Sequence, residues 1–339
     1  IAFRTLSEMS LAKRKDLVAA IRETMIREGD RLAKLAHDET GLGRYEHKCI
    51  KNRLVAEKTP GPESLVPQTT TGDDGLTLME WAPFGVIGAI TPTTNPTSTI
   101  ICNTIGMVSA GNSVVFNVHP GAVESSMETV RLINRAVTGA GGPQNLVTAV
   151  GRPTIESATE LMHHAGINLL VVTGGPGVVA AAMKSGKRAV GAGPGNPPVV
   201  VDETADIAKA ARDIVYGAGF DNNIICVDEK DVFVVDQVAD ELIAAMRREG
   251  AYLVDQAQLR KLEKEIFAEN RGPRAHAVIN KDLVGKDADE ILARINVRGV
   301  GESKLIIAEV PEDHPLVWTE QLMPVLPIVR VPDVDRAIA

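Results

Sequence analysis

The stretch VIGAITPTTNPTSTIICNTIGMVSAGNSVVFNV, residues 86–118, sets a short apolar run on each side of a polar turn and a longer segment. The runs VIGAI (86–90) and SVVFNV (113–118) are typical of buried strands. Between them, Asn95 can cap a helix and Pro96 suits the first helical position. The stretch therefore predicts a strand, a helix and a second strand.

The same alternation continues along the chain. Strands are predicted at 146–150 and 168–175, and helices at about 122–137, 155–164 and 178–184. Strands that alternate with helices in this way are typical of an α/β fold with a doubly wound parallel sheet. Ligands of such sheets bind at the carboxyl ends of the strands.

The regions on either side of this sheet complete the predicted organisation. An amphipathic helix is expected over 10–37 as a helical lead-in, and a loop over 61–75. After the Gly/Pro-rich segment 189–198 a strand and a helix lead to Cys226, and a second α/β unit is expected. Its predicted strands and helices are 231–235, 304–310, 238–248 and 256–270. We therefore expect two domains, 1–198 and 199–339.

Composition excludes several classes of protein. The net charge is -8 and no segment gathers Lys and Arg with aromatic residues, which argues against nucleic acid as a partner. Three cysteines without a CxxC spacing argue against a disulfide framework and a zinc site. No apolar run approaches the ~18 residues of a membrane span. We expect a cytoplasmic protein without membrane or metal, whose start at Ile1 leaves room for an N-terminal extension.

Cys226 lies in GFDNNIICVDEK (219–230), behind polar residues that suit a turn. Taken alone, it reads as a small buried hydrophobe or as a nucleophile. Asp228 and Glu229, if close, would raise its pKa, so a reactive thiolate would need backbone N–H groups or another positive dipole. Cys49 and Cys102 fall on predicted helices and are taken as structural.

Three other features could carry chemistry. The side-chain oxygen of Asn95 could cap the helix while its nitrogen donates to an oxyanion. TGGPG (173–177), between a strand and a helix, is either a plain turn or a phosphate-binding turn. His119 and Pro120 begin another predicted helix, where the imidazole is either a surface group or a ligand contact.

Taken together in order, these segments resemble the aldehyde dehydrogenase superfamily from end to end, and more narrowly its coenzyme A-acylating members of the propionaldehyde and ethanolamine-pathway acetaldehyde type. The segments are WAPFGVIGAITPTTNP, VVFNVHPGA, VVTGGPGVV, GAGPGNPPVVVD, FDNNIICVDEK and TEQLMPVLPIVRV. The resemblance implies a nucleotide-binding domain followed by a catalytic domain, with NAD and coenzyme A as cofactors.

Residue by residue, the resemblance implies that Cys226 is the nucleophile and that Asn95 donates to the oxyanion beside the Cys226 N–H. It implies that Glu320 binds the nicotinamide ribose. The remaining cofactor-binding positions that it implies are Ile90, Thr91, Pro92, Asn117, His119, Pro120, Thr173, Gly174, Gly175 and Gly191.

Two departures from the hydrolytic members of the superfamily sharpen this hypothesis. The glutamate base of those members is missing, because residues 191–195 take its place and no carboxylate occurs from Val190 to Val201. Asn117 replaces the lysine that binds the adenosine ribose, which suggests a site open to NAD or coenzyme A. We therefore expect reversible, NAD-dependent oxidation of a short-chain aldehyde to acyl-CoA through a Cys226 thioester. A hydrolytic dehydrogenase and a non-catalytic nucleotide-binding or assembly member remain alternatives.

The resemblance also implies a setting for the protein. It implies a homo-oligomer, and packaging inside a bacterial microcompartment by a helix that would precede Ile1. The second domain is expected to be incomplete at its C-terminal end, because the resembling enzymes continue beyond the position of Ala339.

Overall fold

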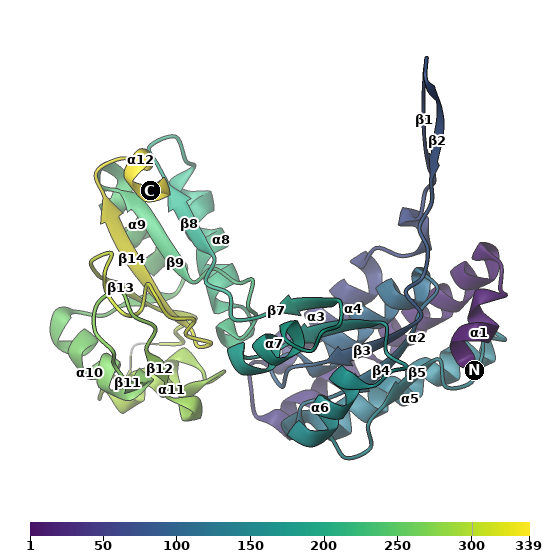
Figure 1. Cartoon of the computed structure of the whole chain (residues 1–339). Coiled ribbons are helices and arrows are strands. Elements are labelled where there is room, and N and C mark those ends of the chain that lie inside the picture. Colours follow the sequence, from purple (N-terminus) through teal and green to yellow (C-terminus); the bar gives the residue numbers. More distant parts are fainter. Residues whose placement is uncertain (300) are drawn as a thin grey trace. The chain divides into compact units, whose positions relative to one another are not determined.

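The computed structural model describes residues 1–299 and 301–339 and divides them into two compact units (Figure 1). The first unit comprises Ile1–Gly41 and Tyr45–Gly193, and the second comprises Leu42–Arg44 and Pro194–Ala339. The short segment Leu42–Arg44 thus belongs to the second unit, and the last passage from the first unit to the second lies inside the Gly/Pro-rich segment.

The first unit is built on a parallel five-stranded sheet with the strand order β5-β4-β3-β6-β7. The chain moves outward from β3 through β4 to β5 and then crosses back to β6 on the other side of β3. This order confirms the doubly wound prediction and places the reversal of strand order between β3 and β6. The strands are β3 (Val86–Ile90), β4 (Ser113–Asn117), β5 (Val147–Ala149), β6 (Leu169–Thr173) and β7 (Ala189–Ala192).

Helices cover both faces of this sheet because its strands are apolar on both sides. One face packs with α2, α4 and α5 in a core that includes Ile87, Val114 and Phe116. The other face packs with α6 and α7 in a core that includes Leu170 and Val172. The helices of this unit are α1 (Ala2–Ser7), α2 (Leu11–Thr40), α3 (Tyr45–Lys58), α4 (Pro96–Ser109), α5 (Val123–Gly139), α6 (Ile155–His163) and α7 (Pro176–Met183), with the 3-10 turns η1 (Pro62–Ser64) and η2 (Pro120–Ala122).

The second unit has its own parallel five-stranded sheet, with the order β10-β13-β14-β9-β8. Helices α8 and α9 pack on one face and α10 and α11 on the other. The strands are β8 (Pro198–Val201), β9 (Asp231–Val235), β10 (Ala251–Leu253), β13 (Leu305–Glu309) and β14 (Val325–Val331), beside a small pair, β11 (Phe267–Glu269) and β12 (Val278–Ile279). The helices are α8 (Ile207–Gly219), α9 (Asp236–Arg248), α10 (Gln256–Ile266), α11 (Ala288–Arg294) and α12 (Val334–Ile338), with the 3-10 turns η3 (Phe220–Asn223) and η4 (Lys281–Leu283).

Two expectations about local structure were wrong, and one strand was not predicted. The expected loop at 61–75 contains η1 and most of an antiparallel hairpin, β1 (Gln68–Gly72) and β2 (Gly75–Met79), whose β-branched threonines favour strands. Residues 189–192 form the edge strand β7, because pairing with β6 outweighs their glycine content. The helix expected over 256–270 ends at Ile266, where the chain pairs as β11.

Among the described residues, no helix is both long enough and apolar enough to cross a membrane.

Candidate active site

Cys226 lies half-buried in a tight turn between η3 and β9. The turn is closed by a hydrogen bond of 3.1 Å from the Asp228 N–H to the Ile225 carbonyl. The Ile225 N–H donates in return to Asp228 Oδ2 at 3.3 Å. Cys226 and Val227 therefore occupy the corner of the turn, where the Val227 side chain is exposed.

Three consecutive residues before this turn hold left-handed backbone conformations. Asp221, Asn222 and Asn223 have φ angles of 47°, 56° and 61°. Each such residue costs roughly 1–2 kcal/mol unless local hydrogen bonds offset it, which Asp and Asn side chains can provide. Asp221 Oδ1 accepts from the Arg44 N–H at 2.7 Å, and Asn222 Nδ2 donates to the Gly285 carbonyl at 2.9 Å. The polar run that the sequence suggested as a turn therefore has a strained backbone, which side-chain hydrogen bonds hold in place before Cys226.

The buried side chain of Lys230 forms hydrogen bonds to the same segment. Lys230 is fully buried, and its ammonium donates to the carbonyl oxygens of Asn223 at 2.7 Å and Ile225 at 3.0 Å. It also donates to Asn223 Oδ1. Three acceptors match the three protons of an ammonium group, so Lys230 holds the backbone that leads into Cys226. Burial lowers the pKa of Lys230 to about 8.

The segment that the sequence singled out for its missing glutamate packs directly on this turn. A Cβ on Gly195 would lie 2.1 Å from the Cys226 carbonyl oxygen, so only glycine fits there. The Gly195 N–H donates to Glu320 Oε1 at 3.1 Å. Next to it, Asn196 Nδ2 donates to Asp231 Oδ2 at 2.6 Å. Gly195, Cys226 and Glu320 are thereby gathered at one place in the second unit.

The electrostatics of Cys226 disfavour the thiolate in the absence of ligands. Burial raises the pKa of the Cys226 thiol, and the negative charge of Glu320 raises it further. The ammonium of Lys230 and the backbone N–H of Cys226 lower the pKa, whereas Asp228 makes the smallest contribution and raises it. The opposing influence of Asp228 agrees with the sequence analysis, but the larger one comes from Glu320, which is distant in sequence.

This cluster lies at the amino ends of strands. Gly195 precedes β8, Cys226 precedes β9 and Glu320 precedes β14, and these three strands are parallel neighbours. The nucleophile candidate therefore lies at the edge opposite to the one that the rule for open α/β sheets favours.

In the first unit, Asn95 follows the carboxyl end of β3 and occupies the N-cap position of α4, with Pro96 as the first helical residue. The expectation that its side chain caps the helix is wrong, because it makes no capping hydrogen bond. Its Oδ1 instead accepts from Lys51 Nζ at 2.6 Å, and its Nδ2 donates to Thr94 Oγ1 at 3.0 Å. The ammonium of Lys51 competes successfully for the oxygen.

Several predicted nucleotide-binding residues meet at the carboxyl edge of the first sheet. Ile90 ends β3 and Thr173 ends β6, on the two sides of the point where the strand order reverses. Thr91 Oγ1 is buried without a hydrogen-bond partner among the described residues. The space where a Cβ of Gly175 would lie is open, and α7 begins there without a side-chain cap. Uncapped N–H groups beside an open glycine turn fit a pyrophosphate.

The other predicted residues of this group lie around the same edge. Asn117 ends β4, is buried, and accepts from Ser157 Oγ at 2.7 Å. His119 and Pro120 follow, where His119 Nδ1 accepts from the Gly121 N–H at 3.0 Å and so caps η2. Pro92 follows Thr91 after β3, and Gly191 pairs with Val172 in β7.

The sequence reasoning missed Lys51, Lys230 and the fit of Gly195 against Cys226. A lysine on a helix or before a strand is normally exposed, and nothing local marks Lys51 as buried. For Lys230 the one local signal is VDEKDVFVV, which places it directly before the apolar strand β9.

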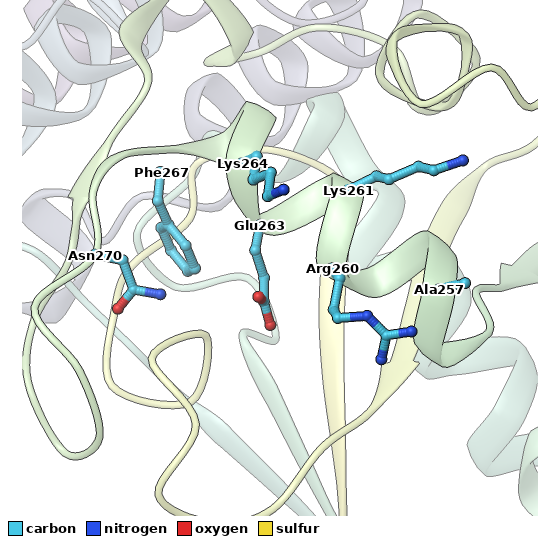
Figure 2. A pocket seen from close by; sticks show the side chains of 7 residues that line it. All are labelled: Ala257, Arg260, Lys261, Glu263, Lys264, Phe267 and Asn270. Carbon is cyan, nitrogen blue, oxygen red and sulfur yellow. The ribbon is translucent and has the colours of Figure 1, made fainter.

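A cavity of about 740 Å³ lies beside α10 in the second unit and contains none of the predicted site residues. In Figure 2 the side chains of Glu263, Phe267 and Asn270 face the same open space, whereas Lys261 points away. Glu263 Oε1 is already bonded to His314 Nε2 at 2.7 Å. The cavity therefore adds no group to the cluster around Cys226.

The fold and the site define a class: a protein of two α/β units, one with an uncapped glycine turn suited to a nucleotide, the other with a cysteine in a lysine-anchored turn. Comparison with known proteins then places the chain. All of residues 1–339 match the aldehyde dehydrogenase family, and the chain belongs to that family. The resemblance found in the sequence, including the coenzyme A-acylating type, is confirmed.

Three similar proteins illustrate the match. Acetaldehyde dehydrogenase (acetylating) EutE of Salmonella typhimurium is 49% identical over 331 residues, which cover 97% of this chain and 71% of the relative. The structure of Rhodopseudomonas palustris propionaldehyde dehydrogenase with bound propionyl-CoA is 48% identical, with a TM-score of 0.93 over 99% of this chain and 74% of that one. A propionaldehyde dehydrogenase from the Clostridium phytofermentans fucose utilisation bacterial microcompartment is 47% identical, with a TM-score of 0.93, covering 99% and 76%.

Proposed function

We propose that this protein oxidises a short-chain aldehyde to acyl-CoA with a nicotinamide nucleotide as hydride acceptor, reversibly and through a thioester on Cys226. The observation that carries the proposal is the contact of Gly195 with Cys226. Gly195 belongs to the segment from Val190 to Val201, which contains no carboxylate. Without a general base there, water is a poor acceptor of the acyl group. The names of the similar proteins support the same reaction.

In the proposed mechanism, the Cys226 thiolate attacks the aldehyde carbon and forms a tetrahedral thiohemiacetal. The resulting oxyanion accepts hydrogen bonds from the Asn95 carboxamide and the Cys226 backbone N–H. Loss of hydride to the nicotinamide leaves the acyl group on Cys226 as a thioester. The thiolate of coenzyme A, the second substrate, then displaces Cys226, so one thioester is exchanged for another and the reaction runs in either direction.

Within this proposal the first unit binds the nucleotide and the second carries the nucleophile. Thr173, Gly174 and Gly175 would hold the pyrophosphate, which the open space at Gly175 and the uncapped start of α7 support. Glu320 would bind the nicotinamide ribose. The remaining contacts along the nucleotides would come from Ile90, Thr91, Pro92, Asn117, His119, Pro120 and Gly191.

The proposed function is tested by NADH formation with acetaldehyde, propionaldehyde and butyraldehyde, each with and without coenzyme A. We expect NADH over many turnovers only when coenzyme A is present, and none from Cys226→Ala. Sustained turnover without coenzyme A would show hydrolysis to the free acid instead. A wild-type protein that forms no NADH from any of the three aldehydes would favour the non-catalytic alternative.

We further propose that the protein is a homo-oligomer in which a second copy covers the β1–β2 hairpin. The hairpin projects from the rest of the first unit, and every residue of both strands is exposed (Figure 1). Leu76 and Leu78, on one face of β2, are 69% and 57% exposed. A two-stranded hairpin alone is at best marginally stable in water, and such apolar patches mark interaction sites. Leu76→Ser/Leu78→Ser should lower the mass measured by light scattering.

Residence in a bacterial microcompartment is the last part of the proposal. It is supported by the solved relative from the fucose utilisation microcompartment. Sedimentation of the protein with intact compartments from cells that produce both would support it, and recovery only in the soluble fraction would contradict it.

A further inference from the structure

The carboxamide of Asn95 is oriented by a buried lysine on another helix. Lys51 lies on α3, is only 7% exposed, and places its ammonium 2.6 Å from Asn95 Oδ1. An ammonium group has donors and no acceptor, so it can pair only with the oxygen of the amide. The contact therefore decides which way the carboxamide faces and directs its nitrogen away from Lys51.

The nitrogen that is left has one hydrogen to spare. Nδ2 carries two N–H groups, and one donates to Thr94 Oγ1 at 3.0 Å. No residue that the structure describes accepts the second. Because Asn95 is partly exposed, this second N–H can reach a ligand. The carboxamide oxygen thus accepts from a cation, and one N–H remains for a ligand. An oxyanion donor requires this arrangement.

Asn52, the next residue of α3, helps to hold Lys51 beside Asn95. Asn52 is buried and its Oδ1 accepts from Thr97 Oγ1 at 2.8 Å, while its Nδ2 donates to the Gly29 carbonyl at 2.9 Å. Thr97 is in the first turn of α4, two residues after Asn95. Consecutive residues of α3 thus bind the cap position and the first turn of α4, which leaves the lysine little freedom to move.

A cation at this place is costly for the fold. The N-terminus of a helix carries partial positive charge and favours anions. Lys51 nevertheless brings a positive charge to the N-cap residue of α4, a helix whose first turn has no acidic residue. The two positive potentials add at the carboxamide, where they would stabilise negative charge that develops on a substrate.

We infer that Lys51 is a positioning residue for the proposed reaction: it orients and polarises the Asn95 carboxamide as the oxyanion donor. This inference rests on the proposed function of Cys226 and Asn95. Lys51 acts through Asn95 and does not itself touch the substrate. Its contribution is therefore specific to steps in which an oxyanion forms, and absent from reactions of Cys226 in which none forms.

Two reactions of Cys226 separate these cases without nucleotide or coenzyme A. p-Nitrophenyl acetate acylates a cysteine through a tetrahedral oxyanion and releases p-nitrophenolate, whereas iodoacetamide alkylates it by direct displacement at carbon. We expect Lys51→Met to slow acylation on the order of 100-fold, as the loss of an oxyanion donor does, and to leave alkylation unchanged. Lys51→Arg should recover part of the acylation rate, because a guanidinium also donates to the Asn95 oxygen.

Two further variants control for structure and for the route through Asn95. Thr97→Val removes one hydrogen bond of Asn52 but keeps the Asn52–Gly29 bond and the Lys51–Asn95 contact, so it should lower the melting temperature and slow acylation much less than Lys51→Met does. The double variant Lys51→Met/Asn95→Ala should be acylated no more slowly than Asn95→Ala alone. If Lys51 acts only through Asn95, the effects of the two substitutions do not add.

Each result has a defined meaning. Wild-type acylation in Lys51→Met, equal slowing of acylation and alkylation, or equal slowing in Thr97→Val overturns the inference and leaves the proposed nucleophile in place. Acylation that persists in Cys226→Ala overturns the proposed nucleophile, and the role of Lys51 falls with it.

Discussion

Gly195 and Cys226 are in van der Waals contact at a point where a side chain cannot be accommodated: a Cβ on Gly195 would lie 2.1 Å from the Cys226 carbonyl oxygen. The two residues belong to different motifs of the sequence, GAGPGNPP and FDNNIICVDEK. Their contact joins the segment that leads into β8 to the turn that carries the proposed nucleophile. The glycine is therefore part of the support of Cys226.

Substitution at Gly195 tests this support. Gly195→Ala should displace the Cys226 turn, destabilise the protein by about 1–3 kcal/mol as overpacking does, and slow acylation by p-nitrophenyl acetate. Gly193→Ala is a matched control in the same motif, because nothing lies within 4 Å of the Cβ it would add. Urea unfolding and acylation rates check both. Equal behaviour of the two variants would contradict the contact.

The charge of Glu320 should be visible in the reactivity of Cys226. Glu320 raises the pKa of the Cys226 thiol, so Glu320→Gln should lower that pKa and move the pH profile of iodoacetamide alkylation to lower pH. The maximal alkylation rate at high pH should change little, because the thiol remains equally accessible. An unmoved profile would show that the two groups are not electrostatically coupled.

Lys230 should be important for stability as well as for the thiol. Lys230→Met removes the donor of three buried acceptors and should destabilise the protein by about 3 kcal/mol or more. It should also raise the pKa of Cys226, since the ammonium lowers it. Lys209→Met, which breaks an exposed ion pair with Asp213, should leave the free energy of unfolding nearly unchanged. Chemical denaturation separates the two variants.

The buried carboxyl of Asp231 predicts a pH dependence of stability. Burial raises the pKa of Asp231 to about 8, whereas an unfolded aspartate titrates near pH 4. Between these values the folded protein binds a proton that the unfolded chain does not, so this carboxyl makes stability fall as pH rises from about 4 to about 8. Asp231→Asn should remove that slope in denaturation curves. A slope unchanged by the substitution would assign it to other groups.

The protonated state also fits the local hydrogen bonding. Asp231 Oδ2 accepts from Asn196, while Asp231 Oδ1 and Asn196 Oδ1 are buried without a donor among the described residues. A proton on the carboxyl supplies a donor where two oxygens lack one. The amide of Asp231→Asn would supply such a donor at every pH, which makes it the appropriate neutral replacement.

Much of the first unit could be predicted from the sequence. The strands at 86–90 and 113–118 and the helix after Pro96 were recognisable because buried parallel strands are short and apolar, and helix starts carry local signals. The hairpin at 68–79 and the edge strand β7 were not, since the Gly, Pro and Asp residues in and around them favour loops and the pairing with a partner strand outweighs that preference. Cys226 and Asn95 were singled out from motif order and resemblance.

What the sequence alone determined is the alternation of elements, the family resemblance, and the absence of a carboxylate between Val190 and Val201. Only the tertiary structure decided that Lys51 takes the oxygen of Asn95 from the helix cap, and that Lys230 holds the turn before Cys226. The physical reason is burial. A lysine in a sequence carries no mark of whether water or a carbonyl surrounds its ammonium, and that is settled only when distant segments pack.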